Sequence, residues 1–129
     1  MIIKGTHENF HNRLYYEWLN NLSVYQQELE HLEQLVNQSG YKGMPLDASI
    51  ELDALKELIK AEQEEMEKLS KEVVERHKES VLACAEQIEG VMAFNELIKT
   101  NQLREKIRKA EHSVFYLRHH VNKLLSLAS

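Results

Sequence analysis

Apolar residues recur at steps of three, four and seven along the middle of the chain, between Asp47 and Glu89. This spacing places their side chains on one side of an α-helix, and the stretch contains no Gly or Pro to interrupt it. At 1.5 Å per residue, the helix would extend over about 65 Å, too far to be enclosed by a small domain. We therefore predict a long central helix on which other helices pack. Its apolar positions are Leu52, Leu55, Ile59, Met66, Leu69, Val73, Cys84 and Ile88.

The region before this helix has the same helical periodicity. Thr6 is suited to cap a first helix, and Gly40 and Pro45 mark its end and the loop that follows. Asp47 is the expected N-cap of the central helix. A loop this short makes the two helices antiparallel neighbours. The apolar positions of the first helix are Phe10, Leu14, Trp18, Leu22, Tyr25, Leu29, Leu32 and Val36, with Tyr15 and Leu19 beside them.

The place where the central helix ends decides between two folds. A turn at 77–80 would give a four-helix up-down bundle, whereas a turn near Gly90 gives three helices. Because the apolar phase continues through 77–80, we predict an all-α, antiparallel bundle of three long, coiled-coil-like helices. This bundle forms a single domain over residues 1–129.

A third helix is expected to run from the turn near Gly90 to about Leu127. Its apolar spacing slips to a step of five between Ile98 and Leu103, so a kink with a fresh N-cap at Thr100 is an alternative. The later part of the helix has an unbroken heptad series, made up of Leu103, Ile107, Ala110, Val114, Leu117, Val121 and Leu124.

Composition agrees with a helical chain that does not enter a membrane. Four Gly and one Pro leave little material for turns, and 29% charged with 43% hydrophobic residues excludes a disordered tail. The longest apolar run, Val81–Ala85, is far below the roughly 20 residues that span a bilayer, and the first residues do not resemble a signal peptide. The single cysteine, Cys84, cannot form an internal disulfide, so we expect a buried thiol and a cytoplasmic protein.

The net charge of −5 is unevenly distributed. From Lys99 onward there are seven Lys or Arg and two Glu, a balance of +5, so the first 98 residues carry −10. A basic helix packed beside acidic helices, in one bundle or across two subunits, explains this asymmetry. We expect no nucleic-acid partner, because the basic residues go around the third helix and the rest of the chain repels phosphate. Glu72 and Arg76, four residues apart on the central helix, are assigned to a solvent-facing pair.

Two blocks at the ends of the chain carry a recognisable pattern. The first is Glu17-Trp18-Leu19-Asn20-Asn21-Leu22 followed by Tyr25 and Glu28, and the second is Leu103-Arg104-Glu105-Lys106, Glu111 and Leu117-Arg118-His119. Together they resemble the opening and closing stretches of small helical proteins from bacteroidete-type bacteria. That family has no assigned activity, so the resemblance implies a helical bundle and no functional residue. The chain lacks the Trp-containing aromatic C-terminus associated with the family.

One arrangement of histidines is a candidate metal site. His7 and His11 lie four residues apart on one face of the first helix, and His77 lies at the same depth on the central helix, counted back from the turn. Three neutral imidazoles and a water molecule would suit zinc. No other group of residues has the spacing of a catalytic or cofactor site. We therefore favour a protein that is not an enzyme and has no cofactor, with zinc at these histidines as the alternative.

The pattern is most typical of a protein-interaction or scaffold module that forms a homodimer. Three helices of unequal length would leave the end of the central helix uncovered, where Val81, Cys84 and Ile88 would face water. A second copy could cover these residues. Trp18 is assigned to the core by its spacing, and its exposure in a partner-binding surface is the alternative.

Overall fold

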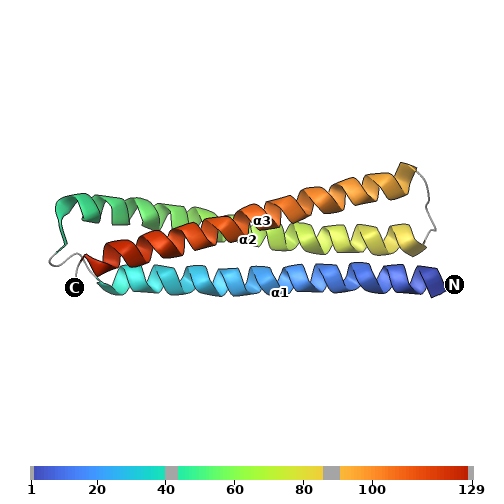
Figure 1. Ribbon diagram of the computed structural model, residues 1–129, viewed down its shortest axis with the longest axis horizontal. Helices are drawn as coiled ribbons and strands as arrows, with labels where there is room; N and C mark the ends of the chain where they lie inside the picture. The colour runs from blue at the N-terminus through green and yellow to red at the C-terminus, as the bar shows by residue number, and fades with distance from the viewer. Residues whose placement is uncertain (1, 40–43, 86–90, 128–129) are drawn as a thin grey trace.

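The computed structural model describes residues 2–39, 44–85 and 91–127 of the chain, and the side chains of 12–38, 44–82 and 94–127. Within these ranges it forms three helices, α1 (Ile2–Ser39), α2 (Leu46–Ala85) and α3 (Val91–Ser126), and no strand (Figure 1). The predicted three-helix bundle is confirmed. The four-helix alternative is wrong, because α2 continues through 77–80 without a break.

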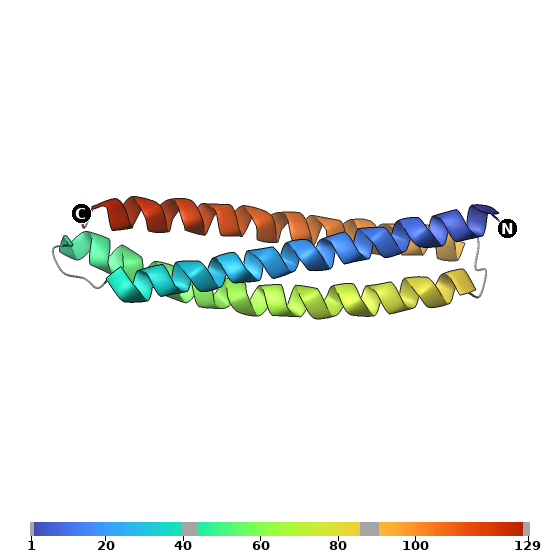
Figure 2. The ribbon, with the colours of Figure 1, turned by 90° about the horizontal axis from the view of Figure 1, so that it is seen from below.

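The three helices lie side by side along one long axis. In two perpendicular views α2 runs opposite to α1, and α3 returns in the direction of α1 (Figures 1 and 2). Every pair of helices is in contact. The start of α1 therefore lies at the same end of the bundle as the end of α2.

Each helix buries one seam, meaning a row of side chains at alternating steps of three and four. Half-buried Tyr25 in α1 and Glu62 in α2 occupy steps that the buried residues leave open. Burial of one Leu or Val side chain favours folding by about 1.5–3 kcal/mol, so the seams hold the bundle together. The apolar members of the seams are Tyr15, Trp18, Leu22, Leu29, Leu32 and Val36 in α1, Ala48, Leu52, Leu55, Ile59, Met66, Leu69 and Val73 in α2, and Leu103, Ile107, Ala110, Val114, Leu117, Val121 and Leu124 in α3.

The helix boundaries differ from the predicted ones at two positions. The first helix begins at Ile2, so Thr6 lies inside it and is not its N-cap. The central helix begins at Leu46, which places Asp47 in the first turn instead of at the cap. The amide of Ser49 donates a 3.0 Å hydrogen bond to the carbonyl of Pro45, so the first turn starts directly at the proline. Gly40 and Gly90 lie outside the described residues.

The three helices are nearly equal in length, with 38 residues in α1, 40 in α2 and 36 in α3. The expectation that the central helix extends well beyond its neighbours is therefore wrong. An uncovered end of α2 would have required that difference in length. The sides of the three helices are the described surfaces on which a partner could bind.

Candidate functional site

Three polar residues, Arg76, Ser80 and Thr100, occupy positions that the seams otherwise reserve for apolar side chains. Arg76 and Ser80 continue the row after Val73 in α2, and Thr100 precedes Leu103 in α3. All three are buried, Arg76 to the point that only 6% of it is exposed. We call Arg76, Thr100, Tyr15 and Glu96 the polar layer, because contacts among them cross the bundle near the start of α1.

The guanidinium of Arg76 is the charged centre of this layer. It forms ion pairs with Glu79 on the same helix and with Glu96 on α3. The Nε atom is also buried and has no hydrogen-bond partner within the described part of the chain. Burial of a cation costs several kcal/mol, and the two carboxylates offset that cost through charge-assisted contacts.

Tyr15 and Thr100 join α1 to α3 within the same layer. The Thr100 hydroxyl donates to the backbone carbonyl of Glu96 at 2.9 Å. The Tyr15 hydroxyl lies 3.4 Å from Thr100 Oγ1, and since the Thr100 hydrogen is already used, Tyr15 is the donor. Thr100 is thus a buried member of the α3 seam. The predicted fresh N-cap at this residue is wrong, because α3 runs through it without a break, and the kink stays a prediction.

His77 lies beside the polar layer on the side of α2 that faces α1. Its Nε2 is 2.6 Å from Oδ1 of Asn12, and its ring centroid is 5.2 Å from that of Tyr15 and 5.7 Å from that of Tyr16. His77 therefore faces α1, as predicted, but at the level of Asn12 and Tyr15 and not opposite the first turn, which begins at Ile2. An amide oxygen accepts a hydrogen bond, so Nε2 carries the proton and only Nδ1 remains for a metal.

Of the three proposed zinc ligands, the structure describes the side chain of His77 alone. The side chains of His7 and His11 lie outside the described residues, so the convergence of the three histidines is untested. Among the side chains that the structure describes, no group of three or more His, Cys, Asp or Glu is arranged to hold a metal ion.

The four residues predicted for partner binding have different outcomes. Trp18 is only 6% exposed and packs edge-on against Tyr15 at 5.4 Å, so its exposed alternative is wrong. Val81 is 38% exposed on α2, in agreement with a surface position. The side chain of Cys84 and the whole of Ile88 lie outside the described residues.

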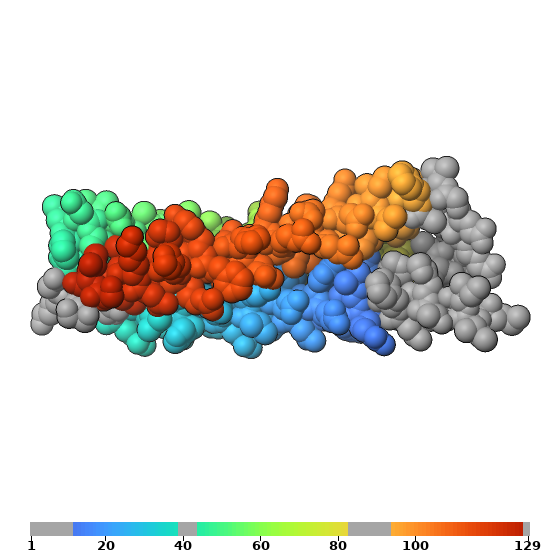
Figure 3. All heavy atoms as spheres, viewed as in Figure 1, coloured from blue at the N-terminus to red at the C-terminus, as the bar shows by residue number. Residues whose placement is uncertain are grey.

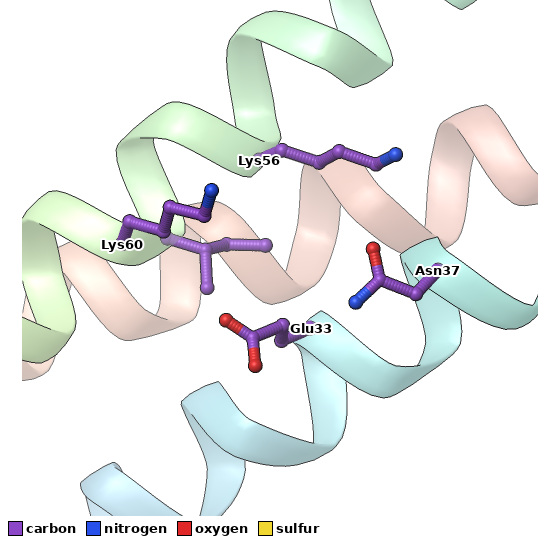
Figure 4. A pocket seen from close by; sticks show the side chains of 5 residues that line it. Glu33, Asn37, Lys56 and Lys60 are labelled. Atoms are coloured by element: carbon purple, nitrogen blue, oxygen red, sulfur yellow. The ribbon is translucent and has the colours of Figure 1, made fainter.

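A groove of about 350 Å³ separates α1 from α2 near the other end of the bundle. Glu33 and Asn37 line it from α1, and Lys56, Ile59 and Lys60 line it from α2 (Figure 4). The charged groups of the groove, those of Glu33, Lys56 and Lys60, lie at the edge of the contact between α1 and α2. None of the five residues that line it is a nucleophile held by a base, so the groove presents no catalytic arrangement.

Ion pairs run along the contact between α2 and α3 in a regular ladder. Lys106 Nζ is 2.7 Å from Glu72 Oε1, and one heptad away Lys99 Nζ is 4.0 Å from Glu79 Oε2. These residues line a groove of about 250 Å³ beside Arg76. The sequence interpretation paired Glu72 with Arg76 on the surface. That assignment is wrong, because Glu72 contacts α3 and Arg76 lies in the seam.

Two titratable groups at seam positions are shifted by their surroundings. Burial, together with the hydrogen bond and the charge of Glu111, raises the pKa of Tyr25 to about 12. Burial and the nearby charge of Glu65 raise the pKa of Glu62 above its ordinary value of 4.5.

The sequence analysis did not predict the seam positions of Glu62, Arg76 and Thr100, because it followed apolar residues only. The heptad spacing, continued without regard to polarity, reaches all three.

None of the three described helices contains a stretch apolar enough, over the length that a bilayer requires, to span a membrane. Comparison of the chain with protein-family models, with curated proteins and with solved structures finds no match.

Proposed function

We propose that this chain is a protein-interaction module, a helical scaffold that associates as a homodimer through the sides of its helices. The observation that carries the proposal is the number of large apolar side chains exposed where the core does not use them. Phe94 is 62% exposed and Leu97 55% exposed on α3, and Leu46 is 75% exposed at the start of α2. Ile50, Leu58 and Tyr116 are exposed as well, so large apolar groups lie on outer helix faces at both ends of the bundle (Figure 1). Apolar side chains left on outer faces are typical of interaction surfaces.

The packing that we propose for each chain is a coiled coil. Buried positions alternate between steps of three and four over most of each helix, and this heptad spacing keeps a seam facing its neighbours when helices supercoil. A coiled-coil rod offers long, nearly flat sides, which suit side-by-side association. We expect this association to take place in the cytoplasm, because a single cysteine suits a reducing compartment.

Measurement of the molar mass in solution tests the proposal. We expect sedimentation equilibrium of the full chain, from about 5 to 500 µM, to give twice the chain mass of 15.1 kDa at the upper concentrations. Light scattering from the same samples excludes larger aggregates. A monomer over the whole range would contradict the homodimer.

A metal-binding bundle is a second candidate, favoured by the place of His77. This residue contacts Asn12, which follows His11 in the sequence. The two proposals differ in the metal content of the purified protein.

A further inference from the structure

The first half of α2 and the second half of α3 share one side of the bundle, at the end that holds the α1–α2 connection (Figure 3). On α2 the exposed positions Glu57 and Glu64 are one heptad apart. The facing half of α3 has no acidic residue after Glu111, and its exposed positions are imidazole, aromatic or basic except for Asn122, Ser126 and Leu127. We call Glu57 and Glu64 the acidic strip, and we call His112, Tyr116, His119 and Lys123 the basic strip.

The ion-pair ladder shows which residues of α2 and α3 lie at the same position along the long axis of the bundle, which we call a level. Glu79 lies opposite Lys99 and Glu72 lies opposite Lys106, so seven residues back along α2 correspond to seven residues forward along α3. Continued by the same step, this register brings Glu65 to the level of Ser113 and Leu58 to the level of His120.

Glu64 precedes Glu65 on α2, and α3 runs in the opposite direction. Glu64 therefore lies one residue beyond the level of Ser113, between His112 and Tyr116. Glu57 in the same way lies at a level between His119 and Lys123. Both carboxylates of the acidic strip share the height of cationic or imidazole groups on the neighbouring helix.

Apolar side chains lie between the charged groups of this face. Tyr116 is 55% exposed and its ring centroid lies 4.2 Å from that of His120, and Leu58 and Ile50 are exposed on α2. A charged strip with exposed apolar groups beside it has the composition of an interface that is held by apolar contact and aligned by charge. None of these side chains belongs to the seams.

We propose that the occupant of this face is a second copy of the chain, which would identify the surface used by the proposed homodimer. A half-turn about an axis parallel to the bundle keeps each residue at its level and exchanges the two helices. The acidic strip of one copy then lies over the basic strip of the other, twice in each dimer. Such an isologous interface needs a self-complementary face, and this face carries both halves.

Paired charge reversals test the assignment on the full chain. The first variant is Glu57→Lys with Glu64→Lys, and the second is His112→Glu with Lys123→Glu. Each variant opposes like charges at both halves of the interface. We expect each to raise the dimer dissociation constant by about tenfold or more at low salt.

An equimolar mixture of the two variants distinguishes this face from a general charge effect. In the mixed dimer both halves of the interface again join opposite charges, so we expect native mass spectrometry to show mainly the heterodimer. The matched control is Glu17→Lys with Glu30→Lys, which makes the same change of charge at exposed positions of α1 and should dimerise like the wild type.

The outcomes separate this inference from the function on which it rests. If the wild type dimerises and both variants dimerise equally well without preferring each other, this face is wrong while the homodimer stands. A wild-type chain that stays monomeric at all concentrations overturns both. Circular dichroism of each variant establishes that it retains the helix content of the wild type.

Discussion

The hydroxyl of Tyr25 donates a 2.5 Å hydrogen bond to Oε2 of Glu111, 86 residues further along the chain. About one turn further along α1 and two turns further along α3, Arg118 Nη1 donates to Glu28 Oε1 at 2.9 Å, across a separation of 90 residues. With the Tyr15–Thr100 contact at a separation of 85, these pairs give the register of the parallel helices α1 and α3. The two sequence blocks that resemble the helical family thus lie side by side, although the resemblance itself stays a prediction.

The Tyr25–Glu111 contact predicts a loss of stability at alkaline pH. Because the pKa of Tyr25 is raised to about 12 in the folded chain, against an ordinary value of 10.0, its contribution is complete below pH 10 and is lost as pH rises toward 12. We expect Tyr25→Phe to lower the unfolding free energy by about 1–2 kcal/mol at pH 8, and by less at each step above pH 10. Urea unfolding from pH 8 to 11.5 measures this change.

The control for the alkaline effect is Tyr16→Phe. Tyr16 is exposed, so this variant should follow the wild type at every pH. A Tyr25→Phe variant whose deficit is the same at pH 8 and pH 11.5 would show that the hydrogen bond to Glu111 does not control the ionisation.

The sequence was sufficient for the number of helices, their order and most of the core. Long runs with apolar residues at steps of three and four leave no other arrangement for residues such as Leu52 and Val114, which are buried as predicted. The apparent slip before Leu103 has a physical cause. The α3 seam passes through Glu96 and Thr100, whose polar side chains are satisfied by Arg76 and Tyr15 on the other helices.

Partners on distant helices cannot be identified from local spacing. Glu72 has Arg76 four residues later, and an isolated helix would pair them. In the bundle, Lys106 of α3 lies 2.7 Å from Glu72, and Arg76 contacts Glu96. The relative lengths of the helices could not be predicted from the sequence either, because no capping residue marks the start of α1 at Ile2.

The polar layer predicts a difference between single and double replacement of its ion pair. Arg76→Leu alone leaves Glu96 with three-quarters of its side chain buried and no cation, and should cost about 2–4 kcal/mol of unfolding free energy. Arg76→Leu combined with Glu96→Leu should be neutral, or stabilising by about 1–4 kcal/mol. Chemical denaturation of these two variants and of Glu96→Leu alone completes a double-mutant cycle.

The exposed ladder provides the comparison for this cycle. Lys106→Met removes an ion pair whose side chains are about half exposed, and it should change stability by about 1 kcal/mol at most. If Arg76→Leu alone were as mild as Lys106→Met, the ion pair of Arg76 would not be a buried one in solution.

Glu62 predicts a gain in stability from removal of a charge. Its folded pKa is raised by burial and by Glu65, so the protonated form is favoured on folding and ionisation near neutral pH opposes folding. Glu62→Gln should therefore raise the unfolding free energy by about 0.5–1 kcal/mol at pH 7, and this gain should decline as pH falls through the raised folded pKa and be gone below the ordinary pKa of 4.5. Thermal unfolding from pH 3.5 to 7.5 follows the change.

The control is Glu67→Gln, at an exposed position of the same helix, which should show no such pH dependence. An equal gain in both variants would mean that net charge alone is responsible.

The metal content of the chain separates the interaction module from the metal-binding alternative at His77. Because Nε2 of His77 is engaged by Asn12 and its ring is packed against Tyr15, the interaction proposal predicts far less than one zinc per chain in protein purified without a histidine tag. It also predicts the same low content in His77→Ala. Inductively coupled plasma mass spectrometry after dialysis against micromolar zinc makes this measurement, with His119→Ala on α3 as the matched control.

One zinc per chain that disappears in His77→Ala, and also in His7→Ala and His11→Ala, would establish the three-histidine site. In that case, Asn12 would have to release His77, or the metal would have to bind through Nδ1.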